Sequence, residues 1–268
     1  STSEKAKKST VVEQEIEAAN RTVASQEAPS ASSLIHTREP LAMLARRGYQ
    51  PGLTTLDLPF ETPLPRKREE RLISLLDHYG YRLFLRGAIL RGNGFLPEET
   101  TRFLKPDTAR EYAEHTVSLG LAHSVADGRY ELVHKALNFG GTLEWYVGKT
   151  LASRFALDTT VGVQFTASGV GGDLDVIAAA EGKLIVIELK SSPPKHLADD
   201  EIAAFLDRIC TLRPHIAIFA VDTSLRLADK VIPMLEIAIE KRTANGKRQD
   251  TAQRVERELW ALGPHLYA

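Results

Sequence analysis

The stretch from Gly171 to Lys190, GGDLDVIAAAEGKLIVIELK, decides the fold of this chain. Two apolar runs, 174–180 and 183–189, lie on either side of Glu181-Gly182, a glycine-containing pair that favours a tight turn. The pattern therefore predicts two neighbouring strands joined by a short turn.

Acidic side chains occur in both predicted strands. Because side chains alternate along a strand, Glu188 and Lys190 share one face of the second strand, and Asp173 and Asp175 share one face of the first. Pairing of the strands can place Asp175 beside Glu188, with Lys190 next to them. Oxygen ligands of this kind suit a hard divalent cation.

A helix upstream of these strands is predicted to carry a further carboxylate on its apolar face. Residues spaced by 3, 7 and 11 positions share one helix face, and here they are Glu144, Val147, Leu151 and Phe155. A carboxylate among apolar side chains is costly without a partner. Glu144 is therefore a candidate functional residue.

An Asp, a β-turn and then Glu-X-Lys at the end of an apolar strand, behind a helix with an inward Glu, resemble the core of the PD-(D/E)XK nuclease superfamily. Leu174 stands where the family's name has Pro before the Asp. The resemblance implies an α/β protein with a restriction-endonuclease-like core, in which helices flank a mixed central sheet.

The resemblance also implies roles for these residues in a metal-dependent hydrolysis. Asp175 and Glu188 would bind Mg2+ or Mn2+, with the Leu189 carbonyl as an additional ligand and Glu144 completing the metal shell. Lys190 would orient and activate the attacking water and stabilise charge on the phosphate. An alternative for Asp175, Glu188 and Lys190 is a solvated surface ion pair of little energetic consequence.

The rest of this region is predicted to complete the order β-β-β-α-β. Strands are expected at 161–167 and 215–221, with a helix at 198–212 between the hairpin and the last strand. Later helices are expected near 227–239 and 250–262. Asp222, just after the last strand, is expected to cap a helix, and the glycine-rich segment 168–172 is expected to be a flexible turn.

The preceding region has helical patterns at 66–79, 81–90 and 107–119, the last with Asp107 as its expected cap. Asp127-Gly128 between apolar-rich runs then predicts a β-hairpin. This order resembles a winged helix-turn-helix, which implies binding of nucleic acid or of protein. The candidate nucleic-acid-binding residues are Arg66, Lys67, Arg68, Arg71 and Arg110, although the last helix also carries acidic side chains, which suit phosphate poorly.

Composition indicates an ordinary soluble chain. It has 268 residues and a formal net charge of -1, so no overall basic charge marks a nucleic-acid surface. Cys210 is the single cysteine, which excludes an intramolecular disulfide and fits a reducing, cytoplasmic location. No apolar run is long enough to span a membrane.

We predict three parts: a flexible N-terminal arm at 1–57, with a short helix possible at 11–23, a winged-helix-like domain at 58–136 and a nuclease-like domain at 137–268. The expected function is metal-dependent cleavage of nucleic acid, with DNA the expected form and a homodimer a further expectation. The alternative is a catalytically silent nucleic-acid-binding or protein-interaction subunit of a larger assembly, such as a defence system. The intact Asp175, Glu188 and Lys190 favour the enzyme.

Overall fold

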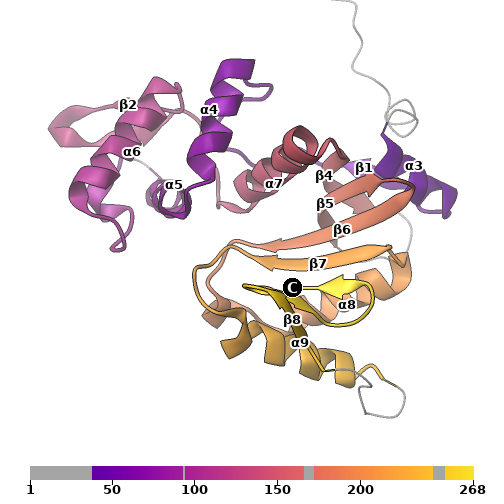
Figure 1. Cartoon of the computed structure of the whole chain (residues 1–268). Coiled ribbons are helices and arrows are strands. Elements are labelled where there is room, and N and C mark those ends of the chain that lie inside the picture. The colour runs from indigo at the N-terminus through magenta and orange to yellow at the C-terminus, as the bar shows by residue number, and fades with distance from the viewer. Residues whose placement is uncertain (1–37, 93, 166–171, 244–250) are drawn as a thin grey trace, which may run out of the picture.

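The computed structural model of the chain describes residues 38–92, 94–165, 172–243 and 251–268. Within these ranges an eight-stranded sheet has the order β1-β4-β5-β6-β7-β10-β9-β8 (Figure 1). Its strands are β1 (Pro51–Leu53), β4 (Asp158–Phe165), β5 (Asp173–Ala180), β6 (Lys183–Lys190), β7 (Ile216–Val221), β8 (Gln253–Glu256), β9 (Leu259–Ala261) and β10 (Leu266–Tyr267).

The β5–β6 hairpin forms as the sequence predicts. Its turn has positive φ at Glu181 (49°) and Gly182 (73°), and Val176 pairs with Ile187 in an antiparallel register. β4 is antiparallel to β5, whereas β7 is parallel to β6. The sheet is therefore mixed, and with helices on its faces it confirms the predicted α/β class.

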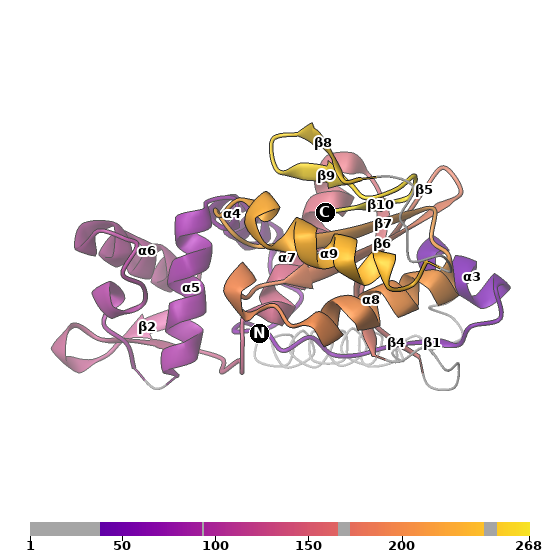
Figure 2. The same ribbon diagram turned by 90° about the horizontal axis from the view of Figure 1, so that it is seen from below.

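One face of the sheet is covered by α3 (Glu39–Arg46) and α8 (Asp199–Leu212). Ile177 and Val186 share a buried apolar core there with Leu44 and Leu212. α9 (Val231–Glu240) packs beside α8, and both helices share a core with β7 (Figure 2). Asp175 and Glu188 belong to this same face by strand alternation.

α7 (Gly140–Phe155) lies against the opposite face. Its Gly148 allows close approach to β4, because a Cβ there would meet the Val161 side chain at 2.6 Å. Leu143 and Trp145 of α7 are buried in a core that Leu189 of β6 also contacts. The predicted helix of Glu144 is thus present and is fixed to the sheet.

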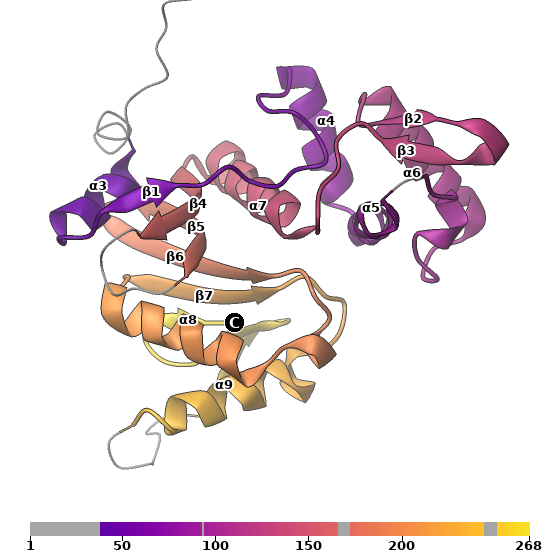
Figure 3. The ribbon, with the colours of Figure 1, turned by 180° about the vertical axis from the view of Figure 1, so that it is seen from behind.

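A helical lobe precedes α7 and extends beyond the sheet (Figures 1 and 3). It contains α4 (Arg66–Leu76), α5 (Tyr79–Arg91), α6 (Pro106–Ser118) and the antiparallel strands β2 (Ala122–Ser124) and β3 (Tyr130–Leu132). The β2–β3 hairpin is confirmed, with positive φ at Asp127 and Gly128. The winged-helix assignment and the boundaries at 58 and 137 stay predictions.

Asp107 is not the cap of α6, contrary to expectation. The helix begins at Pro106, and Lys105 is its N-cap without a side-chain hydrogen bond. Proline favours the first helical position because its fixed φ is already helical and it lacks an N–H that would need a partner. The N-cap is therefore two residues earlier than expected, and Asp107 lies in the first turn of the helix.

Part of the region expected to be a flexible arm is instead built into the sheet. β1 pairs antiparallel with β4, and Leu41 and Leu44 of α3 are buried in the core described above. The apolar face of 41–44 packs on β4 and β5, which are distant in the sequence. Residues 1–37, which include the helix expected at 11–23, and the glycine-rich 168–171 lie outside the described residues.

The helix expected at 250–262 is wrong. Residues 253–261 form β8 and β9, and β10 then adds to β7 in parallel. The backbone N–H of Trp260 donates to the Ala268 carbonyl at 2.8 Å. Pairing of β8 with β9, and of β9 with β10 at the edge of β7, therefore outweighs the helical spacing of the local sequence.

Four short 3-10 helices connect the larger described elements: η1 (Pro97–Glu99), η2 (Ala126–Gly128), η3 (Pro194–His196) and η4 (Leu227–Asp229). The helix expected near 227–239 is thus divided into η4 and α9. In the described ranges, no helix has the length and apolar character needed to cross a bilayer.

Candidate active site

Asp175 and Glu188 lie where β5 and β6 begin to separate. The antiparallel register ends at Val176 and Ile187, so the next residues along it are Asp175 and Glu188. In place of a further backbone pair, the Leu189 N–H donates to Asp175 Oδ2 at 2.6 Å. The structure therefore places the two acids on neighbouring strand ends, as the alternation of side chains predicts.

Glu188 is buried and held between two cations. Its Oε1 lies 3.1 Å from Lys190 Nζ, and its Oε2 accepts a hydrogen bond of 2.6 Å from Arg208 Nη2. Lys190 also contacts Glu201 Oε1 at 3.0 Å. Lys190 therefore stands between two carboxylates, one from its own strand and one from the first turn of α8.

The acids around this point repel one another. Burial, followed by the charge of Glu188, raises the pKa of Asp175 to about 7, against the opposing effects of the Leu189 N–H, Lys190 and Arg208. Burial also raises the pKa of Glu144 to about 8, with the charges of Asp175, Asp173 and Glu188 adding to the effect. The predicted acids are thus close enough for strong electrostatic coupling.

Glu144 on α7 lies near enough to this cluster to feel the charges of Asp175 and Glu188. In the part of the chain that the structure describes, the Glu144 side chain makes no hydrogen bond or ion pair. Its neighbour Tyr146 donates to Asp77 Oδ1 at 2.7 Å, which helps to fix this turn of α7 against the helical lobe. The proposed role of Glu144 in a metal shell stays a prediction.

The donor set suits Mg2+ or Mn2+ in its chemistry, since it consists of carboxylate and carbonyl oxygens. Its arrangement is not a ready metal cage. Among the described residues, no group of three or more His, Cys, Asp or Glu side chains is placed to hold a metal ion. Both oxygens of Glu188 already face cations, and Asp175 Oδ2 accepts the Leu189 N–H.

Arg208 was not predicted from the sequence. It lies on α8 with only 9% of its side chain exposed, and its charge is among those that lower the pKa of Asp175. A signal was present: Arg208 follows Glu201 by seven residues, which places both on one face of the helix. A charged pair on a helix expected to be buried could have indicated a buried ionic site.

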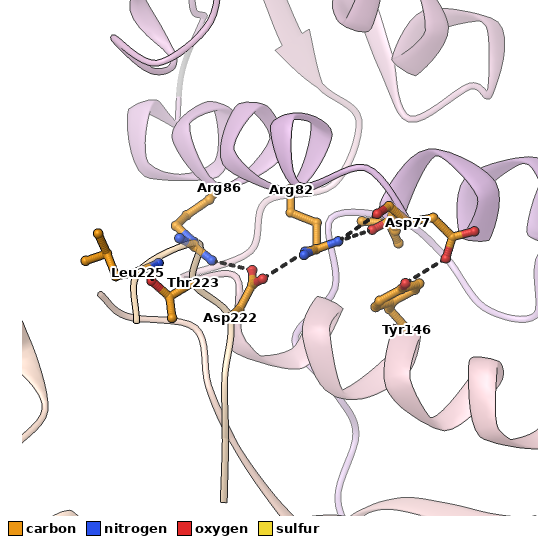
Figure 4. Close-up of polar contacts among 8 residues, drawn as sticks. Asp77, Arg82, Arg86, Tyr146, Asp222, Thr223 and Leu225 are labelled. Atoms are coloured by element: carbon orange, nitrogen blue, oxygen red, sulfur yellow. Dashed lines mark hydrogen bonds and ion pairs between the residues drawn. The ribbon is translucent and has the colours of Figure 1, made fainter. Parts of the chain in front are cut away.

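Asp222 is not a helix cap, contrary to expectation. Its side chain is 5% exposed and joins two arginines of α5: Oδ1 accepts from Arg82 Nε at 2.9 Å and Oδ2 from Arg86 Nη2 at 2.7 Å (Figure 4). The Asp222 N–H donates to the Lys190 carbonyl at 2.8 Å. The helical lobe is thereby tied to the strand ends beside the acid cluster.

A second contact between the lobe and α7 lies next to this one (Figure 4). Arg82 Nη1 donates to the Leu76 carbonyl at 2.6 Å, at the junction of α4 and α5. Asp77, in the same junction, accepts hydrogen bonds from Tyr146 and Arg154 of α7. The lobe is therefore fixed to both the helix and the strands that carry the candidate residues.

The predicted nucleic-acid-binding residues lie on α4 and α6, but their surroundings differ. Arg66 is exposed and pairs with Glu70 Oε1 at 2.8 Å, and Arg71 contacts His115. Lys67 and Arg68 are also exposed on α4. Arg110 pairs with Asp107 at 2.9 Å and approaches Glu98 at 4.0 Å, so its charge is already balanced.

A cavity of about 720 Å³ lies away from the acid cluster. Trp145 and Lys149 of α7 line it together with Thr54 and Thr159. Neither Asp175 nor Glu188 lines this cavity. The candidate site is therefore defined by its charged side chains rather than by a large hollow.

No protein-family model matches the chain, and no curated protein matches its sequence. The solved structures with partial similarity to this chain include two proteins. Protein VC1899 from Vibrio cholerae is 16% identical with a TM-score of 0.44, over 70% of this chain and 53% of that one. Can2 from Sulfobacillus thermosulfidooxidans, in complex with cyclic tetra-adenylate, is 18% identical with a TM-score of 0.42, over 76% and 54%. The chain spans about half the length of each.

Proposed function

We propose that this chain is a divalent-metal-dependent nuclease that hydrolyses phosphodiester bonds in nucleic acid, with DNA as the substrate. The observation that carries the proposal is the meeting of Asp175, Glu188 and Lys190 at the adjoining ends of β5 and β6, where Lys190 Nζ lies 3.1 Å from Glu188 Oε1. This supports the proposal, because hard carboxylate oxygens and an ammonium group lie within one small region.

Asp175 and Glu188 would hold Mg2+ or Mn2+, helped by the Leu189 carbonyl and by Glu144. When bound, such an ion polarises phosphoryl oxygen and makes water a stronger nucleophile. The pKa values of Asp175 and Glu144, raised first by burial and then by neighbouring acids, support cation binding, because a positive charge beside these carboxylates favours their ionised form.

Lys190 would orient the attacking water and stabilise the charge that develops on the phosphate. Its position is well defined, because Glu188 and Glu201 hold the ammonium from two sides at 3.1 and 3.0 Å. The helical lobe, as a winged-helix-like domain, would bind the substrate through the basic first turn of α4. Two copies acting as a homodimer would cut the two strands of a duplex.

A second candidate is a catalytically silent subunit that binds nucleic acid or protein. The observation that favours it is the closed state of Glu188, whose two oxygens both contact cations of the chain itself. In this case the acid cluster would be an internal ion network without turnover. The two candidates differ in whether a divalent ion produces cleavage.

The test is incubation with plasmid, linear duplex, branched DNA and single strands in Mg2+, Mn2+ or EDTA. We expect metal-dependent cleavage that Asp175→Ala and Glu188→Ala each lower by at least about two to three orders of magnitude, the scale of losing a principal electrostatic group. Glu256→Ala removes an exposed carboxylate from the same sheet and should cut at the wild-type rate.

Circular dichroism would establish that the variants are folded. Cleavage that survives both EDTA and the two substitutions would overturn the metal-dependent mechanism. Binding of nucleic acid without cleavage of any of these substrates in either metal would instead favour the silent subunit.

A further inference from the structure

Arg208 reaches the candidate site from α8 and is almost fully enclosed. Its side chain is 9% exposed, and Nη2 donates to Glu188 Oε2 at 2.6 Å. On its other side the guanidinium lies against the backbone of Gly172, where a Cβ would come within 3.0 Å of Nη1. Arg208 therefore lies between the beginning of β5 and the end of β6.

The hydrogen-bonding capacity of Arg208 is not used up by Glu188. Among the described residues, its Nε is buried without a hydrogen-bond partner. A guanidinium carries five N–H donors in a rigid planar fork. Burying such a group without acceptors is costly, so the structure holds donors that a further oxygen-rich group could satisfy.

The two cations on Glu188 are held to different extents. Lys190 has a second carboxylate, Glu201, at 3.0 Å, which retains the ammonium if Glu188 turns away. Arg208 has no second carboxylate among its ion pairs in the described ranges. A divalent ion that takes an oxygen of Glu188 would therefore displace Arg208 more easily than Lys190.

We propose that Arg208 is a further substrate-binding residue of this site. In the metal-free protein Arg208 holds Glu188, and when a divalent ion is bound to Glu188, Arg208 donates hydrogen bonds to the scissile phosphate. This inference rests on the proposed nuclease function. A guanidinium suits the second task because its planar fork matches phosphate oxygens, and repulsion by the bound ion would turn it from Glu188 toward the substrate.

Two quantities distinguish this role from a merely structural one: the affinity for Mn2+ without nucleic acid, and the affinity for a DNA duplex in Ca2+. Arg208→Gln removes the competing charge, so we expect Mn2+ to bind about tenfold tighter or more at pH 8. The same variant should bind the duplex about tenfold more weakly, because a phosphate donor is lost.

Arg208→Lys keeps the charge but removes the fork. We expect Mn2+ affinity close to that of the wild type, with duplex affinity in Ca2+ again lowered. Arg242→Gln is the matched control, since Arg242 pairs with Asp207, the neighbour of Arg208 on α8, at 2.8 Å. It should leave both affinities unchanged.

Isothermal titration and electron paramagnetic resonance would measure Mn2+ binding, and fluorescence anisotropy would measure duplex binding. If Arg208→Gln does not fold, Arg208→Lys still tests the inference, because its affinity for the duplex should fall while its affinity for Mn2+ stays unchanged. The inference would be overturned if Arg208→Gln bound Mn2+ only as tightly as the wild type, or if Arg208→Lys bound the duplex as tightly as the wild type. The proposed function would still stand in that case, provided that the wild type cleaves nucleic acid. Absence of Mn2+ binding and cleavage in the wild type would instead overturn the proposed function itself.

Discussion

Two buried carboxylates, Glu188 and Asp222, lie at the same end of the sheet, and each stands between two cations. Their side chains are 6% and 5% exposed. Lys190 and Arg208 contact Glu188, whereas Arg82 and Arg86 contact Asp222. The two sites are linked, because the Asp222 N–H donates to the Lys190 carbonyl.

The surroundings of the two carboxylates differ. Near Glu188, the pKa values of Asp175 and Glu144 are raised to about 7 and about 8, first by burial and then by neighbouring acids. Asp222 instead joins two arginines of one helix to the end of a strand. The comparison shows that acids outnumber their partners around Glu188, whereas the matched charges at Asp222 hold two parts of the fold together.

The largest expected effect tests the structural half of this comparison. Asp222→Ala leaves the largely enclosed Arg82 and Arg86, 16% and 15% exposed, without their carboxylate, so we expect the free energy of unfolding to fall by about 3 kcal/mol. Urea denaturation followed by circular dichroism would measure it. Asp229→Ala is the control, because Asp229 forms an exposed pair with Arg226 and should change stability by under about 0.5 kcal/mol. A loss below about 1 kcal/mol for Asp222→Ala would contradict a structural role.

The next effect tests the chemical half. Lys190→Met keeps the length of the side chain and removes its charge, so we expect kcat to fall about 100-fold to 1000-fold with little change in substrate affinity. Single-turnover cleavage in Mg2+ and equilibrium binding in Ca2+ would separate the two. If substrate binding fell in proportion to the cleavage rate, Lys190 would have a structural role, like that of Arg82 and Arg86 beside Asp222.

The sequence was sufficient for the parts of this site that are local. The β5–β6 hairpin follows from alternation around Glu181-Gly182, and the helix of Glu144 follows from its spacing, because both patterns lie within one element or one turn. Register then brings Asp175 beside Glu188 without any further information. The core acids and Lys190 could therefore be located before the structure.

The remaining contacts come from distant parts of the chain. Arg82 and Asp222 are 140 residues apart, and no local pattern relates them. The same applies to β1, which pairs with β4 where a flexible arm was expected. It applies also to β8 and β9, which join the sheet through β10 where a helix was expected. Arg208 had only a weak signal, its shared helix face with Glu201.

A smaller effect concerns pH in the metal-free protein. Asp175 and Glu144 have pKa values raised from 3.8 to about 7 and from 4.5 to about 8 by burial and neighbouring acids. The folded state therefore binds protons more strongly than the unfolded state, and the resulting stability is present below about pH 4 and lost as the pH rises through 7 to 8. Asp175→Asn keeps an acceptor for the Leu189 N–H and should make this loss smaller.

Thermal unfolding in EDTA between pH 4.5 and 9 would measure the loss. Mn2+ should restore the thermal stability of the wild type at high pH, because the cation offsets the repulsion that the bound protons relieve at low pH. If the stability of the wild type and of Asp175→Asn depended equally on pH, Asp175 would not be an acid with a raised pKa beside Glu188. The surroundings of Glu188 and Asp222 would then not differ in the way described above.

The smallest expected effect compares an unpaired and a paired cation on the surface of the helical lobe. Lys67 on α4 is exposed and has no ion pair among the described residues, whereas Arg110 on α6 is balanced by Asp107 and Glu98. An unbalanced cation that contacts phosphate releases about one counterion, so Lys67→Gln should weaken duplex binding a few-fold and lower the salt slope by about 1. Arg110→Gln should change the slope less, because its charge already has acidic partners. Anisotropy titrations in Ca2+ over a range of salt would compare them, and a larger change for Arg110 would place the nucleic acid on α6 rather than on the first turn of α4.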